Sequence, residues 1–297
     1  RLLVREGEAV FVEEPGYTNG FHLFQSTGAR TVGIPLDGGG LRLDLLAARA
    51  ERVPPRLLYV MPIFQNPTGL CLAEDRRVPL LELCARRRIP VIEDQFDADL
   101  FYEGGPPAPL KAADARGQVV LLGSFSKMLF PGLRLGWMAV PRALLAPLRE
   151  LKQVSDFASG LFAQCAMHLF CRRGLLDQHL ERVRGIYGGR LRAMLGAMEA
   201  CFPPAASWTR PRGGLTLWVT LPPGVDALEL LPAARREGVD LSPGALFYPN
   251  GGGAGEIRLS WIREPEERIR RGIEVLGSLL AGLGERVAAA PASGPFF

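Results

Sequence analysis

Lys127 stands where a lysine could act as a nucleophile. It is one of three lysines among 35 basic residues, and it follows the apolar run 119–122 and the hydroxyl residues Ser124 and Ser126. Lysine is costly to bury and its pKa falls when it is desolvated, so a lysine at a strand end suits Schiff-base chemistry. Ser124, Ser126 and Arg134 could hold a phosphate beside it, with a bidentate contact from the arginine. This combination indicates pyridoxal 5′-phosphate, although the lysine motif alone is more typical of a solvated surface loop.

Two further polar residues follow strands that we expect in the same sheet. Asn66 opens the turn Asn-Pro-Thr-Gly after the strand 57–62, and Asp94 follows the strand 90–93. Each alone would be an ordinary turn or helix-cap residue. If both share a sheet edge with Lys127, they complete a site for a pyridine cofactor. Asp94 would keep the ring nitrogen protonated, so that the ring can withdraw electrons, and the Asn66 amide would bond the ring oxygen.

Short apolar runs alternate with helical patterns over the first 160 residues. The patterns predict strands at 9–13, 31–34, 57–62, 90–93, 119–122 and 136–140, and helices at 18–27 and 73–88. Continuous apolar strands between helices are typical of an α/β fold with a mostly parallel sheet covered on both faces. Ligands bind beyond the carboxyl ends of such strands, which is where the three motifs lie.

The pattern changes after residue 160. We expect helices at 161–173, 175–201, 226–237 and 264–283 and strands at 214–221 and 257–261. This predicts a large cofactor-binding domain over residues 1–178 and a small C-terminal α+β domain over 179–297. Residues 1–4 suggest the end of a helix, so we expect that the natural protein extends upstream and that the large domain is incomplete at its N-terminus. Residues 288–297 are expected to fray.

The composition and charge of the chain argue against several classes of function. Hydrophobic residues make up 47% and charged residues 22% of the chain, as in ordinary globular proteins. The net charge of +4 comes from interspersed signs, without a basic run that would suit nucleic acid. No apolar run approaches the ~20 residues of a membrane span, and no signal peptide is visible. The five cysteines fit no zinc-binding spacing, so we expect no metal, reduced thiols and a cytoplasmic location.

Together the motifs resemble those of the fold-type I, PLP-dependent aminotransferases of class I and II. In chain order they are Pro15-Gly16-Tyr17, Asn66-Pro67-Thr68-Gly69, Glu93-Asp94, Ser124-Phe125-Ser126-Lys127 and Gly132-Leu133-Arg134. Segments 93–102, 123–136 and 212–221 most resemble the aminotransferase-like domain of the MocR subgroup of GntR-type transcription regulators. The resemblance implies the type I fold, with a mostly parallel sheet between helices and a smaller C-terminal domain. It also implies a homodimer with its sites at the subunit interface.

The resemblance assigns a role to each residue around the cofactor ring. Lys127 would form the Schiff base with the cofactor and then carry the proton. Asp94 would pair with the pyridinium nitrogen, Asn66 would contact the ring hydroxyl oxygen, and Tyr17 would stack on the ring face.

Other roles concern the phosphate and the substrate. Ser124, Ser126 and Arg134 would hold the phosphate. Arg258 would clamp the α-carboxylate of an amino acid, because its planar fork meets a carboxylate bidentately. Phe96 is a departure from the family, since many relatives carry there a tyrosine that donates to the cofactor oxygen.

Two functions remain open on the sequence. The first is an enzyme that transfers an amino group between an amino acid and a 2-oxo acid. The alternative is a PLP-binding effector domain of a MocR-type regulator whose winged-helix domain is absent from this chain. In that case DNA would be contacted only through the upstream domain. Neither function calls for a membrane.

Overall fold

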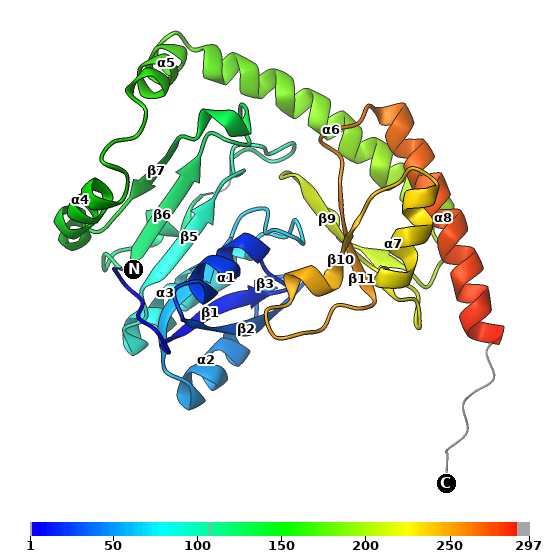
Figure 1. Cartoon of the computed structure of the whole chain (residues 1–297), viewed down its shortest axis with the longest axis horizontal. Helices are drawn as coiled ribbons and strands as arrows, with labels where there is room; N and C mark the ends of the chain where they lie inside the picture. The colour runs from blue at the N-terminus through cyan, green and yellow to red at the C-terminus, as the bar shows by residue number, and fades with distance from the viewer. Residues whose placement is uncertain (1, 107, 290–297) are drawn as a thin grey trace.

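The protein contains two sheets of unequal size. The computed structural model describes residues 2–106 and 108–289, and Figure 1 shows the larger sheet in blue to green and the smaller one in yellow to orange. The larger sheet has seven strands in the order β3-β2-β1-β4-β5-β6-β7. Its strands are β1 (Ala9–Glu14), β2 (Arg30–Asp37), β3 (Gly40–Leu41), β4 (Pro55–Val60), β5 (Val91–Gln95), β6 (Val119–Ser124) and β7 (Gly136–Ala139).

The five central strands are parallel, and β1 and β4 are mostly buried, as their apolar runs predict. Only the edge strands β3 and β7 run antiparallel to their neighbours. Side chains alternate between the faces along each strand. Phe11 and Leu58 therefore meet α2 (Leu43–Arg52) and α3 (Glu74–Arg87) on one face, and Val10 packs with α1 (Thr18–Gln25) on the other.

The smaller sheet is antiparallel, in the order β10-β11-β9-β8. Its strands are β8 (Ser207–Trp208), β9 (Thr216–Thr220), β10 (Ser242–Pro243) and β11 (Glu256–Ser260). Residues of this sheet share one apolar core with α6 (Leu175–Cys201), α7 (Ala227–Arg236) and α8 (Glu266–Ala289). The sequence predicted these three helices, and the short strands β8 and β10 are additions of the structure.

One long helix connects the two halves. α6 is continuous and runs from the side of α4 (Arg142–Asp156) and α5 (Leu161–Arg172) to the small sheet, as Figure 1 shows. The expected domain boundary at 178/179 therefore falls within the first turn of a helix and not in a linker.

The expectation of a helix at residues 1–4 is wrong for the described part of that segment. Leu2, Leu3 and Val4 are not helical. Val4 is buried in the cluster that contains Val10 and Met61, so contact with the sheet, rather than helix propensity, decides its conformation. At the other end, residues 288 and 289 of the segment expected to fray, 288–297, belong to α8, which reaches Ala289; the rest of that segment, 290–297, lies outside the described residues.

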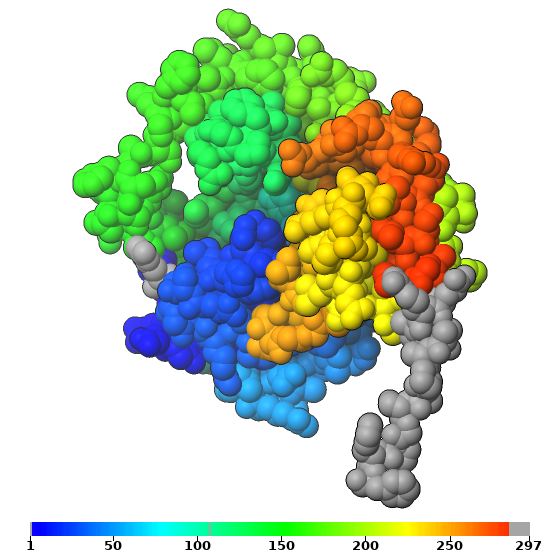
Figure 2. All heavy atoms as spheres, turned by 45° about the vertical axis from the view of Figure 1, so that its right-hand side comes forward, coloured from blue at the N-terminus to red at the C-terminus, as the bar shows by residue number. Residues whose placement is uncertain are grey.

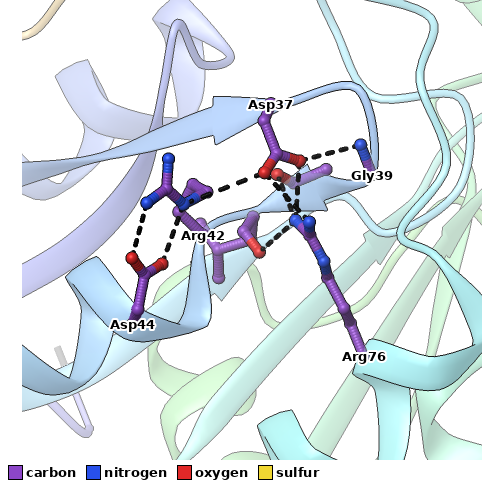
Figure 3. A network of polar contacts seen from close by, with 7 residues as sticks. Asp37, Gly39, Arg42, Asp44 and Arg76 are labelled. Atoms are coloured by element: carbon purple, nitrogen blue, oxygen red, sulfur yellow. Dashed lines mark hydrogen bonds and ion pairs between the residues drawn. The ribbon is translucent and has the colours of Figure 1, made fainter.

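A charged cluster ties the β2–β3 hairpin to α3 (Figure 3). The carboxylate of Asp37 accepts two hydrogen bonds from Arg76, at 2.7 and 2.9 Å, and one from the backbone N–H of Gly39 at 2.8 Å. Arg42 lies 3.8 Å from the same carboxylate and also pairs with Asp44. The hydrogen bond from Arg76 holds the pKa of Asp37 below its usual value, so the cluster anchors the sheet edge at neutral pH.

Two kinds of feature are absent from the part of the chain that the structure describes. No helix there is long and apolar enough to cross a membrane. Nor do three or more His, Cys, Asp or Glu side chains gather there as a metal site would require.

Candidate active site

The carboxyl ends of four adjacent parallel strands form the candidate site. β1, β4, β5 and β6 all end at the same edge of the large sheet, and Asp94 on β5 lies opposite Leu122 on β6. The turns after these strands carry Tyr17, Asn66 and Lys127. The structure therefore brings the three motifs to one sheet edge, as the α/β pattern predicts.

Asn66 is held in place by its neighbour Gln65. The Gln65 side chain donates to the Pro15 carbonyl at 2.9 Å and accepts from the Thr68 hydroxyl at 2.6 Å. Thr209 in turn donates to the Thr68 carbonyl at 2.6 Å. The turn after β4 is thus bonded both to the turn after β1 and to the small domain, and Asn66 is buried within it.

The segment before Asn66 explains two glycines of the small domain. Phe64 adopts φ +47°, and its ring lies against Gly213 and Gly214. A Cβ atom on Gly213 would come within 2.2 Å of that ring, and Gly214 itself has φ +75°. Only glycine fits this approach, which gives a structural reason for the Arg-Gly-Gly sequence at 212–214.

Asp94 is bonded to a residue that the sequence motifs did not single out. The Tyr59 hydroxyl on β4 donates to Asp94 Oδ2 at 2.6 Å. Burial raises the pKa of Asp94, and the hydrogen bond from Tyr59 opposes that rise. The adjacent Glu93 faces away and accepts the backbone N–H groups of Leu110 and Lys111 at 2.7 and 2.8 Å. Of the Glu-Asp pair, only Asp94 belongs to the site.

Two more buried carboxyl groups lie near Asp94. Glu13 is 5% exposed, and the backbone N–H of Met61 donates to its Oε2 at 3.0 Å. Burial raises the pKa of Glu13 to about 8. Asp97 is 2% exposed, and its Oδ1 has no hydrogen-bond partner among the described residues. Burial raises the pKa of Asp97 as well, whereas the charge of Lys127 acts in the opposite sense.

The side chain of Lys127 is exposed, so the expectation of a desolvated lysine is wrong for this structure. Lys127 lies in the turn after β6 and not in the buried part of the strand itself. Within the described residues its ammonium group forms neither a hydrogen bond nor an ion pair. By contrast, Lys111 is bonded to Asp114 and Lys152 to Asp156. Lys127 is therefore the lysine whose amine is available to a ligand.

Arg134 follows the turn that comes next in the chain after the turn of Ser126. Ser124 Oγ accepts the backbone N–H of Ser126 at 3.2 Å, and the N–H of Phe125 donates to the Leu135 carbonyl at 3.1 Å. Arg134 immediately precedes Leu135, has φ +51° and is exposed. The structure thus places the three predicted phosphate ligands at the end of β6 and in the two turns that follow it.

Tyr17 faces Phe96 across the site. The ring centroids are 6.0 Å apart and the planes differ by 24°. A third ring between them would need about 7 Å, twice the ~3.5 Å contact distance of carbon atoms. A cofactor ring could therefore not be sandwiched between the two as they stand, and its contact with Tyr17 must lie at the edge or on the other face of the tyrosine.

Arg258 reaches the site from the small domain. Its Nη1 donates to Asn66 Oδ1 at 3.3 Å and its Nη2 to Ser242 Oγ at 3.0 Å. Burial lowers the pKa of Arg258, and the electrostatic effect of the nearby Tyr17 hydroxyl acts in the opposite sense. The guanidinium therefore lies next to Asn66 and Tyr17, as the predicted role requires.

One groove in the surface lies away from the candidate site. A groove of about 550 Å³ between α6 and α8 is lined by Gly189, Ala193 and Arg270, among others. It contains none of the predicted site residues. The assignment of the site therefore depends on topology and side-chain chemistry rather than on cavity size.

Sequence comparison identifies a family. The profile of the aminotransferase class I and II family matches residues 1–276. Aromatic-amino-acid aminotransferase 1 of Thermococcus litoralis is 35% identical over 285 residues, which cover 94% of this chain and 68% of that protein. The uncharacterized HTH-type transcriptional regulator YdfD of Bacillus subtilis is 32% identical, over 96% of this chain and 58% of the regulator. This chain thus spans about two thirds of the first relative and less of the second.

Structure comparison agrees. LysN, an α-aminoadipate aminotransferase from Thermus thermophilus, was solved in complex with N-(5′-phosphopyridoxyl)-L-leucine. It superposes with a TM-score of 0.90 at 34% identity, over 97% of this chain and 74% of LysN. The two-sheet architecture described above is therefore the type I fold that the motifs predict.

Proposed function

The chain belongs to the aminotransferase class I and II family, and on this premise we propose that it transfers an amino group between an amino acid and a 2-oxo acid. Its cofactor is pyridoxal 5′-phosphate. The observation that carries the proposal is the meeting of a half-buried carboxylate, an amide and an available lysine at one sheet edge, next to an arginine from the small domain. These groups are Asp94, Asn66, Lys127 and Arg258.

The side chains present suit this cofactor. A carboxylate complements a protonated ring nitrogen, and the half-buried Asp94 is the carboxylate to which Tyr59 donates a hydrogen bond. Serine hydroxyls and an arginine complement a phosphate, and Ser124, Ser126 and Arg134 lie at the end of β6 and in the two turns that follow it. When bound, the cofactor supplies an aldehyde for amine exchange and an electron-accepting ring.

The residues of the chain would divide the remaining tasks. Lys127 Nζ would bind the cofactor aldehyde and, once released, move a proton to and from the substrate α-carbon. Asp94 would hold the proton on the ring nitrogen. Asn66 would orient the ring through its hydroxyl oxygen. Arg258 would bind the substrate carboxylate with its two terminal nitrogens.

A turnover assay tests the proposal. Purified protein with pyridoxal phosphate, a panel of L-amino acids and a 2-oxo acid acceptor should form the new amino acid over many cycles. Lys127→Ala should abolish this, and Lys152→Ala should not, because Lys152 pairs with Asp156 on the exposed helix α4. Failure of the wild type to bind the cofactor at all would contradict the proposal.

The second candidate function is the effector domain of a transcription regulator. The similarity to YdfD, which extends over 96% of this chain, supports it. An effector domain would bind the cofactor and an amino acid yet complete no repeated cycles. DNA would then be bound by a separate winged-helix domain. Cofactor binding with a single, non-repeating spectral change would therefore favour this second function over the enzyme.

We also propose that two copies of the chain form a homodimer. α4 contains no buried residue, and Phe157 and Phe162 beside it are 87% and 89% exposed. Figure 2 shows an opening between this green segment and the body of the molecule. Exposed apolar side chains of this extent mark interaction surfaces. Light scattering should report twice the monomer mass, and Phe157→Ser with Phe162→Ser should reduce it.

Domain division and location complete the proposal. The large domain would end and the small domain begin within α6, near residue 178. A cytoplasmic location is supported by the cysteines, all five of which are free thiols.

A further inference from the structure

Tyr59 and Asp94 link the core of the sheet to the candidate site through a hydrogen bond. Tyr59 lies opposite Ile92 in the register of β4 and β5, and Asp94 is two residues beyond Ile92. Side chains two apart on a strand share a face, so Tyr59 can reach diagonally to Asp94. Its hydroxyl donates to Asp94 Oδ2 at 2.6 Å, and Tyr59 is only 6% exposed.

The tyrosine ring is held in position from the opposite side. Phe24 on α1 meets it edge-to-face at 5.7 Å. Gly20 on the same helix approaches so closely that a Cβ there would lie 2.9 Å from Tyr59 Cε1 and 3.1 Å from the hydroxyl oxygen. α1 therefore restricts the ring, and the hydroxyl has a defined direction toward Asp94.

The surroundings give that hydrogen bond an electrostatic role. The charged or titratable groups that face this part of the site are Glu13 from β1, Asp97 after β5, Tyr17 after β1 and Lys127 after β6. Two of these are buried carboxyl groups, Glu13 and Asp97, whose pKa values the charge of Asp94 raises. Among the described residues, Tyr59 is the one hydrogen-bond donor to the Asp94 carboxylate, and a donor favours the charged form.

We propose that Tyr59 is a positioning residue, which keeps Asp94 as a carboxylate and holds Oδ2, so that Oδ1 is directed to the protonated ring nitrogen of the cofactor. This inference rests on the proposed function. Tyr59 itself would touch neither cofactor nor substrate. It would act through the charge and the orientation of Asp94.

The test is the affinity for pyridoxal phosphate, measured by absorbance titration across pH. Tyr59→Phe should bind the cofactor roughly tenfold more weakly, since one hydrogen bond to a charged group is lost. The pH below which the protein loses its affinity for the cofactor should rise, because Asp94 without its donor is protonated more readily. Tyr248→Phe is the matched control. Tyr248 also donates to a carboxylate at 2.6 Å, but to that of Glu256 on β11 and not to Asp94. The Tyr248→Phe variant should keep the wild-type affinity for pyridoxal phosphate and the wild-type pH dependence of binding.

A double-mutant cycle separates positioning from a merely structural role. In an Asp94→Asn background, adding Tyr59→Phe should change cofactor affinity by less than about twofold. An equal loss in both backgrounds would overturn the inference while leaving the proposed function intact. A wild type that binds no cofactor would overturn both. If Tyr59→Phe does not fold, Gly20→Ala displaces the tyrosine with a methyl group, and unchanged affinity in that variant would also overturn the inference.

Discussion

Arg258 Nη1 donates a hydrogen bond to Asn66 Oδ1 at 3.3 Å, although 192 residues separate the two in the chain. Asn66 belongs to the turn after β4 of the large sheet, and Arg258 belongs to β11 of the small sheet. The contact therefore joins the two sheets at the candidate site. Within the described residues Arg258 has amide and hydroxyl acceptors but forms no ion pair. Its charge is available to a substrate carboxylate.

Arg258→Lys should weaken the binding of amino acids by about 10- to 100-fold. A lysine ammonium cannot supply the two parallel hydrogen bonds of the guanidinium, and bonds between charged groups are the strong ones. Absorbance titration of the cofactor-loaded protein would measure this. Arg210→Lys, which changes an exposed arginine paired with Glu199, should have little effect. If the wild type bound decarboxylated amines as tightly as amino acids, Arg258 would not be the clamp.

Borohydride reduction of the cofactor-loaded protein should attach the pyridoxyl group to Lys127. The other two lysines are engaged, since Lys111 donates to Asp114 and Val119 and Lys152 donates to Asp156 and Ser159. Peptide mapping by mass spectrometry would locate the label. A label confined to Lys111 or Lys152 would rule out the assignment.

Glu13→Gln should remove part of the pH dependence of stability. The folded protein keeps the proton on Glu13 up to about pH 8, whereas the unfolded chain releases it near pH 4.5. Between these values the folded state binds more protons, so the free energy of unfolding falls as pH rises, by on the order of a few kcal/mol in all. Urea unfolding at pH 5 and pH 8 would measure the difference.

The glutamine variant should gain stability relative to the wild type as pH rises from 5 to 8. Glu237→Gln, at an exposed glutamate after α7, serves as the control and should follow the wild type at both pH values. Parallel pH curves for the wild type and Glu13→Gln would show that Glu13 is ionised in the folded protein.

Phe96→Tyr should lower the pH at which the absorbance of the bound cofactor changes. The ring centroids of Phe96 and Tyr17 lie 6.0 Å apart at the site. A phenylalanine there cannot donate a hydrogen bond. A tyrosine hydroxyl that donates to the cofactor oxygen would favour the anionic oxygen and compete for the proton shared with the Lys127 linkage. A pH titration of the visible band reads the midpoint. A midpoint that stays or rises would place residue 96 out of reach of that oxygen.

The order and type of the main elements could be predicted from local sequence. Apolar runs such as 119–122 and helical patterns such as 175–201 reappear as β6 and α6, because a buried strand and an amphipathic helix each require a characteristic spacing of apolar residues. The motif residues at strand ends could also be found, since a parallel sheet brings its carboxyl ends to one edge. Tyr59 could have been noticed as a hydroxyl within an apolar strand, which needs a partner when buried.

The remaining features could be recognised only in the tertiary structure. Tyr59 meets Asp94 only because β4 and β5 are neighbours in a given register, and no local pattern encodes that pairing. Burial raises the pKa of Glu13, Asp97 and Asp94 alike, and the hydrogen bond from Tyr59 opposes that rise only at Asp94. Lys127 is exposed, although its place after an apolar strand suggested a desolvated side chain. Residue types and their order thus determined which chemistry the chain carries, while the tertiary structure, which sets distance and desolvation, decided which of these groups meet and which are charged.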